Sequence, residues 1–180
     1  HARIDALYRM TSGNVSGARM DLETYVQRYY LERILYAANR RFQEMSAGQF
    51  ELRMYDLEKA GEGKNRGLDL MVYSTVTGKE REVRTLSGGE SFMAALSLAL
   101  GMADQIQESS AAVNLDMMFI DEGFGSLDGE TLDNAISILD EVREERMVGI
   151  ISHVDSLAQS VPCHIDVEKS NCGSRIHVSA

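Results

Sequence analysis

Two adjacent carboxylates in the second half of the chain could do chemistry together. Met117 to Ile120 is a short continuous apolar run, and Asp121 and Glu122 follow it directly. Such a run is typical of a buried strand in a parallel sheet, and ligands bind at the carboxyl ends of these strands. Two neighbouring ionised carboxylates repel each other and therefore favour a bound cation. The pair predicts that Asp121 holds Mg²⁺ and that Glu122 orients and deprotonates an attacking water, as nucleotide hydrolysis requires. For an isolated pair, acidic residues that only face solvent are the simpler alternative.

A serine and two glycines open a helical pattern earlier in the chain. Ser87, Gly88, Gly89 and Glu90 precede a helix expected to run to about Gln107. Ser87 is a good N-cap, and the glycines let a ligand approach the backbone closely. A helix N-terminus also offers unpaired N–H groups and about half a positive charge, so the turn is suited to a phosphate. An ordinary helix cap remains the alternative for this motif alone.

A histidine follows the next expected buried strand, at Val148 to Ile151. If this strand lies beside the Met117–Ile120 strand, His153 emerges at the same edge as Glu122. Its imidazole could then hydrogen-bond a terminal phosphate and fix the geometry between the water and its base. A glycine-rich loop from Gly123 to Asp128 lies between these motifs, and Asp128 is also a plain N-cap candidate for the helix that follows.

The order of these motifs resembles the second half of an ABC-type ATPase, with its signature motif, Walker B motif, D-loop and switch histidine. The stretch from Asp121 to Asp128 lacks the proline that usually follows the carboxylates in transporters. It is similar to the SbcC family, SMC-like ATPases that act with a DNA exonuclease. Ala38 to Phe42 and Met45 to Arg53 resemble the segment where SbcC proteins emerge from their coiled coil. The resemblance covers about residues 20–178.

This resemblance implies a role for each motif. Two complete heads would sandwich two ATP molecules, with the signature turn contacting the ATP of the opposite head. The implied ATP-binding residues are Ser87, Gly88, Gly89, Glu90 and Asp128. The implied catalytic residues are Glu122 and His153, and the implied metal ligand is Asp121. The cofactors are then ATP and Mg²⁺. The implied partners are a second head in a homodimer, an SbcD-like nuclease and DNA.

The chain lacks the phosphate cradle that such an enzyme needs. A P-loop reads Gly-x₄-Gly-Lys-Ser/Thr. Gly63-Lys64 and Gly78-Lys79 do not fit this pattern, because neither an earlier glycine nor a following serine or threonine is in place. In SbcC proteins the P-loop lies in an N-terminal lobe, joined through a long coiled coil. We therefore expect this chain to be the C-terminal lobe alone and to hydrolyse no ATP by itself.

The elements that position these motifs follow from periodicity. A long helix is expected from Asp21 to about Gly48, and residues 1–20 are expected to be the end of a coiled coil or a frayed terminus. Expected strands are 50–55 and 68–76, paired as a hairpin around the 61–67 loop, and then 117–120, 148–151, 164–167 and 175–178. Helices are expected at 132–142 and 155–160. The prediction is an α/β lobe of an ABC-type head, with a P-loop NTPase-like parallel sheet flanked by helices, occupying residues 21–180.

Composition limits the remaining possibilities. The chain has 180 residues, 44% of them hydrophobic and 26% charged, which excludes a disordered protein. Its net charge of −10 excludes a generally basic nucleic-acid binder, but residues 1–90 hold 14 basic and 13 acidic residues against 4 and 15 in residues 91–180. DNA contact would therefore need a local patch. Candidates are Arg33, Arg40, Arg41, Arg53, Lys59, Lys64, Arg66, Lys79, Arg81 and Arg84, for each of which ordinary solvation is the alternative.

The chain is expected to be cytoplasmic and not to contact a membrane. Its longest apolar stretch, Phe92 to Ala103, is about half of what a bilayer span needs. Two cysteines, Cys163 and Cys172, suggest a reducing compartment and are expected to be buried or free thiols. The alternatives within the class are other SMC-like heads, such as RecN or a condensin-type ATPase. A lobe that only binds a partner is the alternative from another class.

Overall fold

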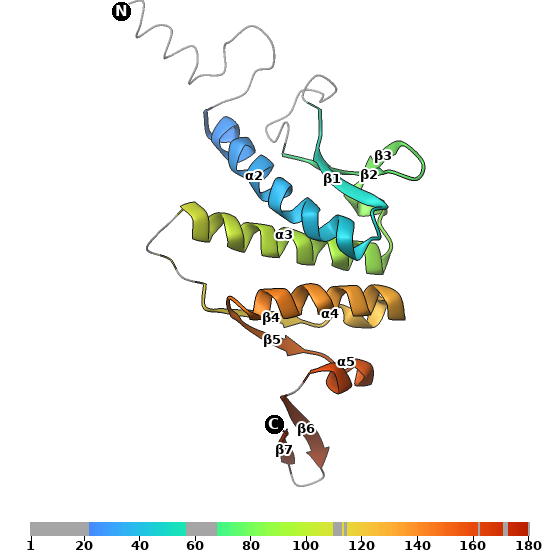
Figure 1. Cartoon of the computed structure of the whole chain (residues 1–180), viewed down its shortest axis with the longest axis vertical. Coiled ribbons are helices and arrows are strands. Elements are labelled where there is room, and N and C mark those ends of the chain that lie inside the picture. The colour runs from blue at the N-terminus through green and yellow to red at the C-terminus, as the bar shows by residue number, and fades with distance from the viewer. Residues whose placement is uncertain are drawn as a thin grey trace, which may run out of the picture. The chain divides into compact units, whose positions relative to one another are not determined.

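The computed structural model describes residues 22–56, 68–109, 113, 115–161, 163–170 and 173–179. The chain divides into two compact units, His1–Leu115 and Asp116–Ala180 (Figure 1). The expected coiled-coil end at residues 1–20 and the 61–67 loop lie outside the described residues. The assignment of residues 21–180 to one half of an ATPase head stays a prediction.

A long helix, α2 (Leu22–Met45), begins the described part of the first unit. It ends as the sequence predicts, because Gly48 takes the left-handed conformation with φ 75°. The Gly48 N–H donates to the carbonyl of Gln43 at 2.6 Å, which satisfies one of the last free carbonyls of the helix.

An antiparallel sheet follows, made of β1 (Phe50–Met54), β2 (Leu70–Ser74) and β3 (Lys79–Glu82) in that order. The predicted hairpin is β1 and β2, with Leu52 opposite Val72 and both side chains buried. The third strand replaces the expected turn end at Lys79. Each of its residues is charged, so no alternation of apolar and polar residues announces it, and its pairing with β2 decides its conformation.

The signature turn leads into α3 (Gly88–Ser109), after a short 3₁₀ helix, η1 (Val83–Thr85). α3 packs along α2 (Figure 1). The helices meet closely at Gly101, where an added Cβ would lie 2.7 Å from the Ile34 carbonyl oxygen and 2.8 Å from the Ala38 nitrogen. An ion pair between Arg41 and Asp104 at 2.5 Å joins the same two helices.

The second unit contains the predicted parallel strands. β4 (Met117–Asp121) pairs with β5 (Met147–Ile151), and α4 (Gly129–Arg143) connects them and packs on β5. The 3₁₀ helix η2 (Phe124–Ser126) lies between β4 and α4. The parallel β4–β5 pair with its connecting helix confirms the predicted α/β class.

The expectation that both strands are fully buried is wrong. Alternate side chains along the pair are exposed: Met117, Phe119, Met147 and Ile151. A parallel sheet is buried on both faces only where helices cover both, and here α4 is the helix that packs on β5. The Phe119 ring lies across Gly149 instead, where an added Cβ would come within 2.6 Å of it.

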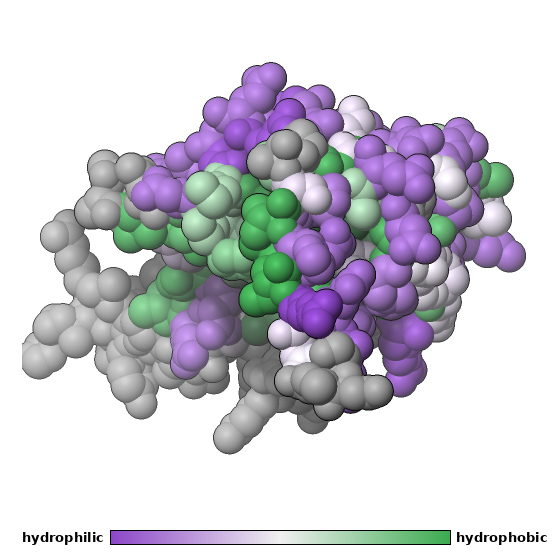
Figure 2. All heavy atoms as spheres, turned by 90° about the horizontal axis from the view of Figure 1, so that it is seen from below, coloured by the Kyte–Doolittle hydropathy of each residue, from purple (hydrophilic) through white to green (hydrophobic). Residues whose placement is uncertain are grey.

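The described chain ends in α5 (Asp155–Ser160) and a hairpin of β6 (His164–Ser170) and β7 (Gly173–Ser179). Both predicted strands are present and longer than expected. The hairpin pairs Ile165 with Val178 and Val167 with Ile176, and all four side chains are exposed. Figure 2 shows apolar side chains reaching the molecular surface among polar ones.

The Cys163 thiol is free and exposed, while Cys172 lies outside the described residues. Among the described helices, none combines the length and apolar character that crossing a bilayer requires.

Candidate functional site

The two carboxylates lie at the carboxyl end of β4, as predicted. Asp121 is the last strand residue and pairs with Ile151 of β5. Glu122 continues the ladder by one bond, with its N–H donating to the Ile151 carbonyl at 2.8 Å. Its φ of 57° puts a residue with a side chain into the left-handed region. Such strain is costly and gathers at functional sites, so the backbone supports a role for this turn.

His153 emerges at the same edge, as the parallel pairing predicts. Its Nδ1 atom lies 3.9 Å from Oε1 of Glu122. This distance is beyond a hydrogen bond but within ion-pair range when the imidazole is protonated. Both side chains are exposed, at 78% and 68%. The arrangement leaves space in front of both groups, where a substrate phosphate and a water can be placed and the contacts can tighten.

The loop after Glu122 is held beside His153. The Phe124 side chain is buried and anchors the loop, and the Ser126 hydroxyl donates to the Gly123 carbonyl at 2.8 Å. Gly123 has φ 95°, a conformation that favours glycine. An added Cβ at Gly125 would lie 3.7 Å from Nε2 of His153, so the loop passes close to the imidazole.

Asp128 is an N-cap in this structure. Its carboxylate accepts a 2.9 Å hydrogen bond from the Thr131 N–H at the start of α4. This bond lowers the pKa of Asp128 from its ordinary value and keeps it ionised. The residue is exposed, so capping and a contact across a head dimer are compatible, and the second role stays a prediction.

Asp121 can supply one ligand of a magnesium site. Its carboxylate is exposed at the strand end. Across the described residues, no group of three His, Cys, Asp or Glu side chains gathers to form a complete metal site. Mg²⁺ is usually bound by one or two carboxylates together with waters and substrate phosphates, so the donor set fits a metal that arrives with a nucleotide.

The signature turn belongs to the first unit. Ser87 and Glu90 form a reciprocal capping box, in which the Ser87 N–H donates to Oε2 of Glu90 at 2.7 Å and the Glu90 N–H donates to the Ser87 hydroxyl at 3.3 Å. Burial raises the pKa of Glu90, but hydrogen bonds from Ser87 and the Arg81 guanidinium outweigh it, so the pKa is lowered. Ser87 and Gly88 are exposed, which leaves the turn accessible to a ligand.

The predicted residues thus form one cluster in each unit. Asp121, Glu122 and His153 meet at one sheet edge of the second unit, and the signature turn opens α3 in the first. Arg81 is a residue that sequence reasoning did not connect with the site, although it contacts Glu90 at 2.8 Å. It lies in the charged strand that no pattern announced, and its only signal was its place among the basic residues of the first half.

Many of the candidate DNA-binding residues contact acidic side chains. Arg33 pairs with Glu108, Arg41 with Asp104, Arg53 with Glu51 and Glu80, Arg81 with Glu90, and Arg84 with Glu82. Lys59, Lys64 and Arg66 lie outside the described residues. Because the pairs neutralise much of this charge, the described part of the first unit does not carry a strong basic patch.

Comparison with known families identifies the motif at the end of β4. Residues 66–141 match a family model described as SbcC/RAD50-like, Walker B motif. The chain is SbcC/RAD50-like in sequence. This SbcC/RAD50-like chain is 44% identical over 174 residues to the SbcC component of the nuclease SbcCD from Lactococcus lactis, which is 94% of this chain and 16% of that protein. It is 51% identical over 148 residues to the same component from Treponema pallidum, which is 82% of this chain and 14% of that protein. It therefore spans about one sixth of the length of these relatives, and the SbcC resemblance is confirmed over that part.

Solved structures confirm the fold of this SbcC/RAD50-like chain. A chain solved in work on ATP-driven dimerization and DNA-stimulated activation of SMC ATPases superposes with a TM-score of 0.68 at 18% identity, covering 87% of this chain and 89% of that one. The Smc head domain with coiled coil and joint of Pyrococcus yayanosii has a TM-score of 0.64 at 20% identity, covering 82% of this chain and 26% of that one. The fold is that of an SMC-type ATPase head lobe.

Proposed function

We propose that this chain is the C-terminal lobe of an SbcC-like ATPase head, which hydrolyses ATP at a head dimer and drives the processing of DNA double-strand ends by a partner nuclease. The observation that carries the proposal is the edge formed by Asp121, Glu122 and His153, next to a strained backbone turn and inside the matched Walker B segment. A lobe that only binds a partner has no need for this arrangement.

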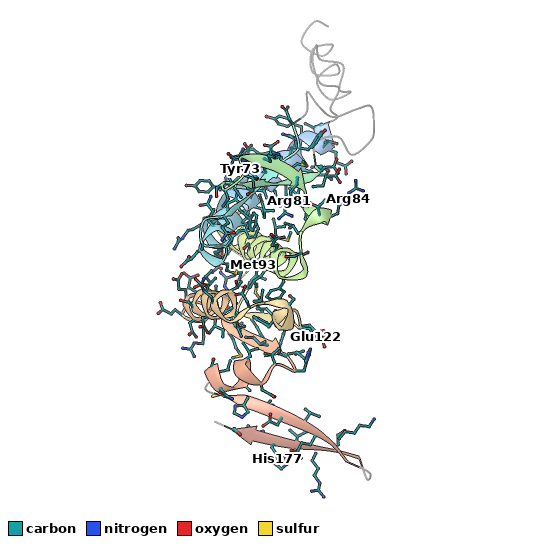
Figure 3. The ribbon with its side chains drawn as sticks, turned by 90° about the vertical axis from the view of Figure 1, so that its right-hand side faces the viewer. Tyr73, Arg81, Arg84, Met93, Glu122 and His177 are labelled. Atoms are coloured by element: carbon teal, nitrogen blue, oxygen red, sulfur yellow. The ribbon has the colours of Figure 1, made fainter. Side chains whose placement is uncertain are left out.

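In this proposal, Glu122 is the general base. Its carboxylate is exposed at the carboxyl end of β4 and faces outward with His153 close by (Figure 3). Glu122 accepts a proton from the attacking water, and His153 holds the terminal phosphate at the distance that lets water and base align. Phosphoryl transfer needs mainly positioning and charge stabilisation, so two well-placed side chains on a rigid sheet edge are adequate for this part of the work.

Asp121 would hold Mg²⁺ together with the nucleotide. The metal, when bound, neutralises charge on the phosphates. The β- and γ-phosphates would be cradled by a P-loop from the N-terminal lobe of the same protein, since the chain holds no P-loop of its own. We accordingly propose that this chain alone hydrolyses no ATP.

The signature turn would act on the ATP of the opposite head. Ser87, Gly88 and Gly89 open α3, where free N–H groups and the helix dipole favour a terminal phosphate. Asp128 would lie at the seam of the dimer. The partners in this proposal are the P-loop lobe, a second head, an SbcD-like nuclease and DNA. The relatives named as components of the nuclease SbcCD support the nuclease partner.

Replacing the base tests the proposal in the full-length protein that contains this chain. Glu122→Gln keeps the side-chain size and removes the proton acceptor. We expect ATP binding to be retained and the rate of hydrolysis to fall by about 10²- to 10⁴-fold, the usual worth of a general base. Steady-state turnover and nucleotide binding to the purified protein give both quantities.

The matched control is Glu141→Gln, which removes the same charge from the exposed face of α4. It should leave turnover unchanged. Near-normal turnover of Glu122→Gln, or an equal loss in both variants, would remove Glu122 from the role of base.

A further inference from the structure

The capping box at the start of α3 uses only half of the Glu90 carboxylate. Oε2 accepts the hydrogen bond from the Ser87 N–H, while the Ser87 hydroxyl accepts from the Glu90 N–H. The hydroxyl acts as an acceptor in this contact, which leaves its own proton to be donated to a ligand. The direction of that hydroxyl therefore depends on where Glu90 is held.

Arg81 takes the other carboxylate oxygen. Its Nη2 donates to Oε1 of Glu90 at 2.8 Å, and its Nη1 donates to the carbonyl of Thr85 at 3.1 Å. The guanidinium also lies 5.4 Å from the centre of the Phe50 ring. One side chain thus connects strand β3, the end of η1 and the first turn of α3.

The sheet register aims Arg81 at this position. Arg81 pairs with Val72, whose side chain is buried, and directly opposed residues of an antiparallel pair share a face. The side chains of Arg81 and Glu90 are 36% and 21% exposed, so their contact is partly shielded from solvent. Figure 3 shows Arg81 and Arg84, three residues further along, as separate side chains of this segment. Arg84 pairs with Glu82 and is 80% exposed, so it belongs to the surface rather than to the signature turn.

We propose that Arg81 is a positioning residue for the signature turn, which holds Glu90, and through it Ser87, in the geometry needed to contact a phosphate on the opposite head. The inference rests on the proposed in-trans role of the turn. Arg81 itself touches no nucleotide in this account. The planar fork of arginine satisfies a carboxylate oxygen and a carbonyl at once, which a lysine ammonium on its flexible stem does less well. A displaced phosphate ligand of about 1 Å can cost a catalytic site about 100-fold in rate.

The test uses the full-length protein with Arg81→Met, Arg81→Lys and the control Arg143→Met. Arg143 is an exposed residue of α4 that pairs with Asp140 one turn away, so its replacement removes one positive charge elsewhere. We expect Arg81→Met to bind ATP as a monomer with unchanged affinity. Its ATP-dependent dimerisation should weaken by at least about 10-fold, and kcat should fall by a similar factor without a matching change of KM. Arg81→Lys should lie between, and Arg143→Met should match the wild type.

A double variant separates positioning from general destabilisation. If Arg81 acts through Glu90, Arg81→Met combined with Glu90→Gln should dimerise no worse than the weaker of the two single variants. Independent, multiplying effects would overturn the proposal. So would wild-type dimerisation of Arg81→Met, or recovery in neither respect by Arg81→Lys. If Arg81→Met fails to fold, the Arg81→Lys and Glu90→Gln pair gives the same comparison.

Failure of this inference and failure of the proposed function give different results. If Ser87→Arg abolishes ATP-dependent dimerisation while Arg81→Met leaves it intact, the signature turn acts in trans and only the role of Arg81 is wrong. If neither variant changes dimerisation, the in-trans role of the turn is itself wrong.

Discussion

At the scale of single residues, Glu122 combines features that its sequence position only partly reveals. The apolar run before it predicted a strand end, and the parallel pairing placed His153 beside it. The left-handed backbone at Glu122 could not be predicted, because it depends on the hydrogen bond to Ile151 across the sheet. The turn points the carboxylate out of the strand, where a base must be to reach a water.

Ser87 offers a second test at this scale. It is exposed at the N-terminus of α3, so an arginine there would place a long charged side chain where the opposite head must approach. We expect Ser87→Arg in the full-length protein to abolish ATP-dependent dimerisation while monomers still bind ATP. Size-exclusion chromatography with and without ATP measures this.

Ser109→Arg is the control for Ser87→Arg, since it adds the same side chain to an exposed position at the other end of the same helix. Dimerisation of Ser87→Arg at the wild-type ATP concentration would contradict the in-trans role.

At the scale of elements, the helix pair α2 and α3 holds the signature turn in place. The side chain of Ala38 is fully buried at the crossing, and Arg33 donates to Gln105 at 2.7 Å further along the pair. The close approach at Gly101 requires the absence of a side chain. A periodic apolar pattern predicted both helices but not this crossing, because contact between them joins residues far apart in the sequence.

Gly101→Ala should therefore destabilise the chain even though alanine is the better helix former. The added methyl would meet backbone atoms of α2 at less than 3.0 Å, which cannot move away cheaply. We expect the free energy of unfolding to fall by about 1–3 kcal/mol, as overpacking usually costs. Urea denaturation measures the change.

Gly129→Ala is the matched control, since nothing lies within 4 Å of an added Cβ at the first position of α4. It should be neutral or stabilise the chain by up to about 1 kcal/mol. Equal stabilities of the two variants would show that the helices can separate at Gly101.

The elements also show where sequence patterns end. Apolar periodicity predicted the long helices and the parallel strands, and Gly48 marked the end of α2. β3 was missed because a fully charged strand has no pattern of its own. The role of Arg81 was missed with it, since its partner Glu90 becomes visible only when the strand is paired.

At the scale of the whole molecule, the chain carries one part of a catalytic set and exposed apolar surface. It has the carboxylates and the signature turn, while its curated relatives are about six times as long. Met117 and Phe119 on β4 and Ile165 and Val167 on β6 are exposed apolar side chains. These surfaces and the missing P-loop are both accounted for by a second lobe that completes the head, as the proposed function requires.

Complementation by the P-loop lobe tests this account most directly. The chain is mixed in equal amounts with the N-terminal P-loop lobe of its full-length protein, and ATP turnover is measured for the chain, the lobe and the mixture. The account predicts no turnover by the chain alone, turnover by the mixture, and loss of that turnover when the chain carries Glu122→Gln. Turnover by the chain alone, or a mixture that hydrolyses ATP equally well with Glu122→Gln, would contradict it.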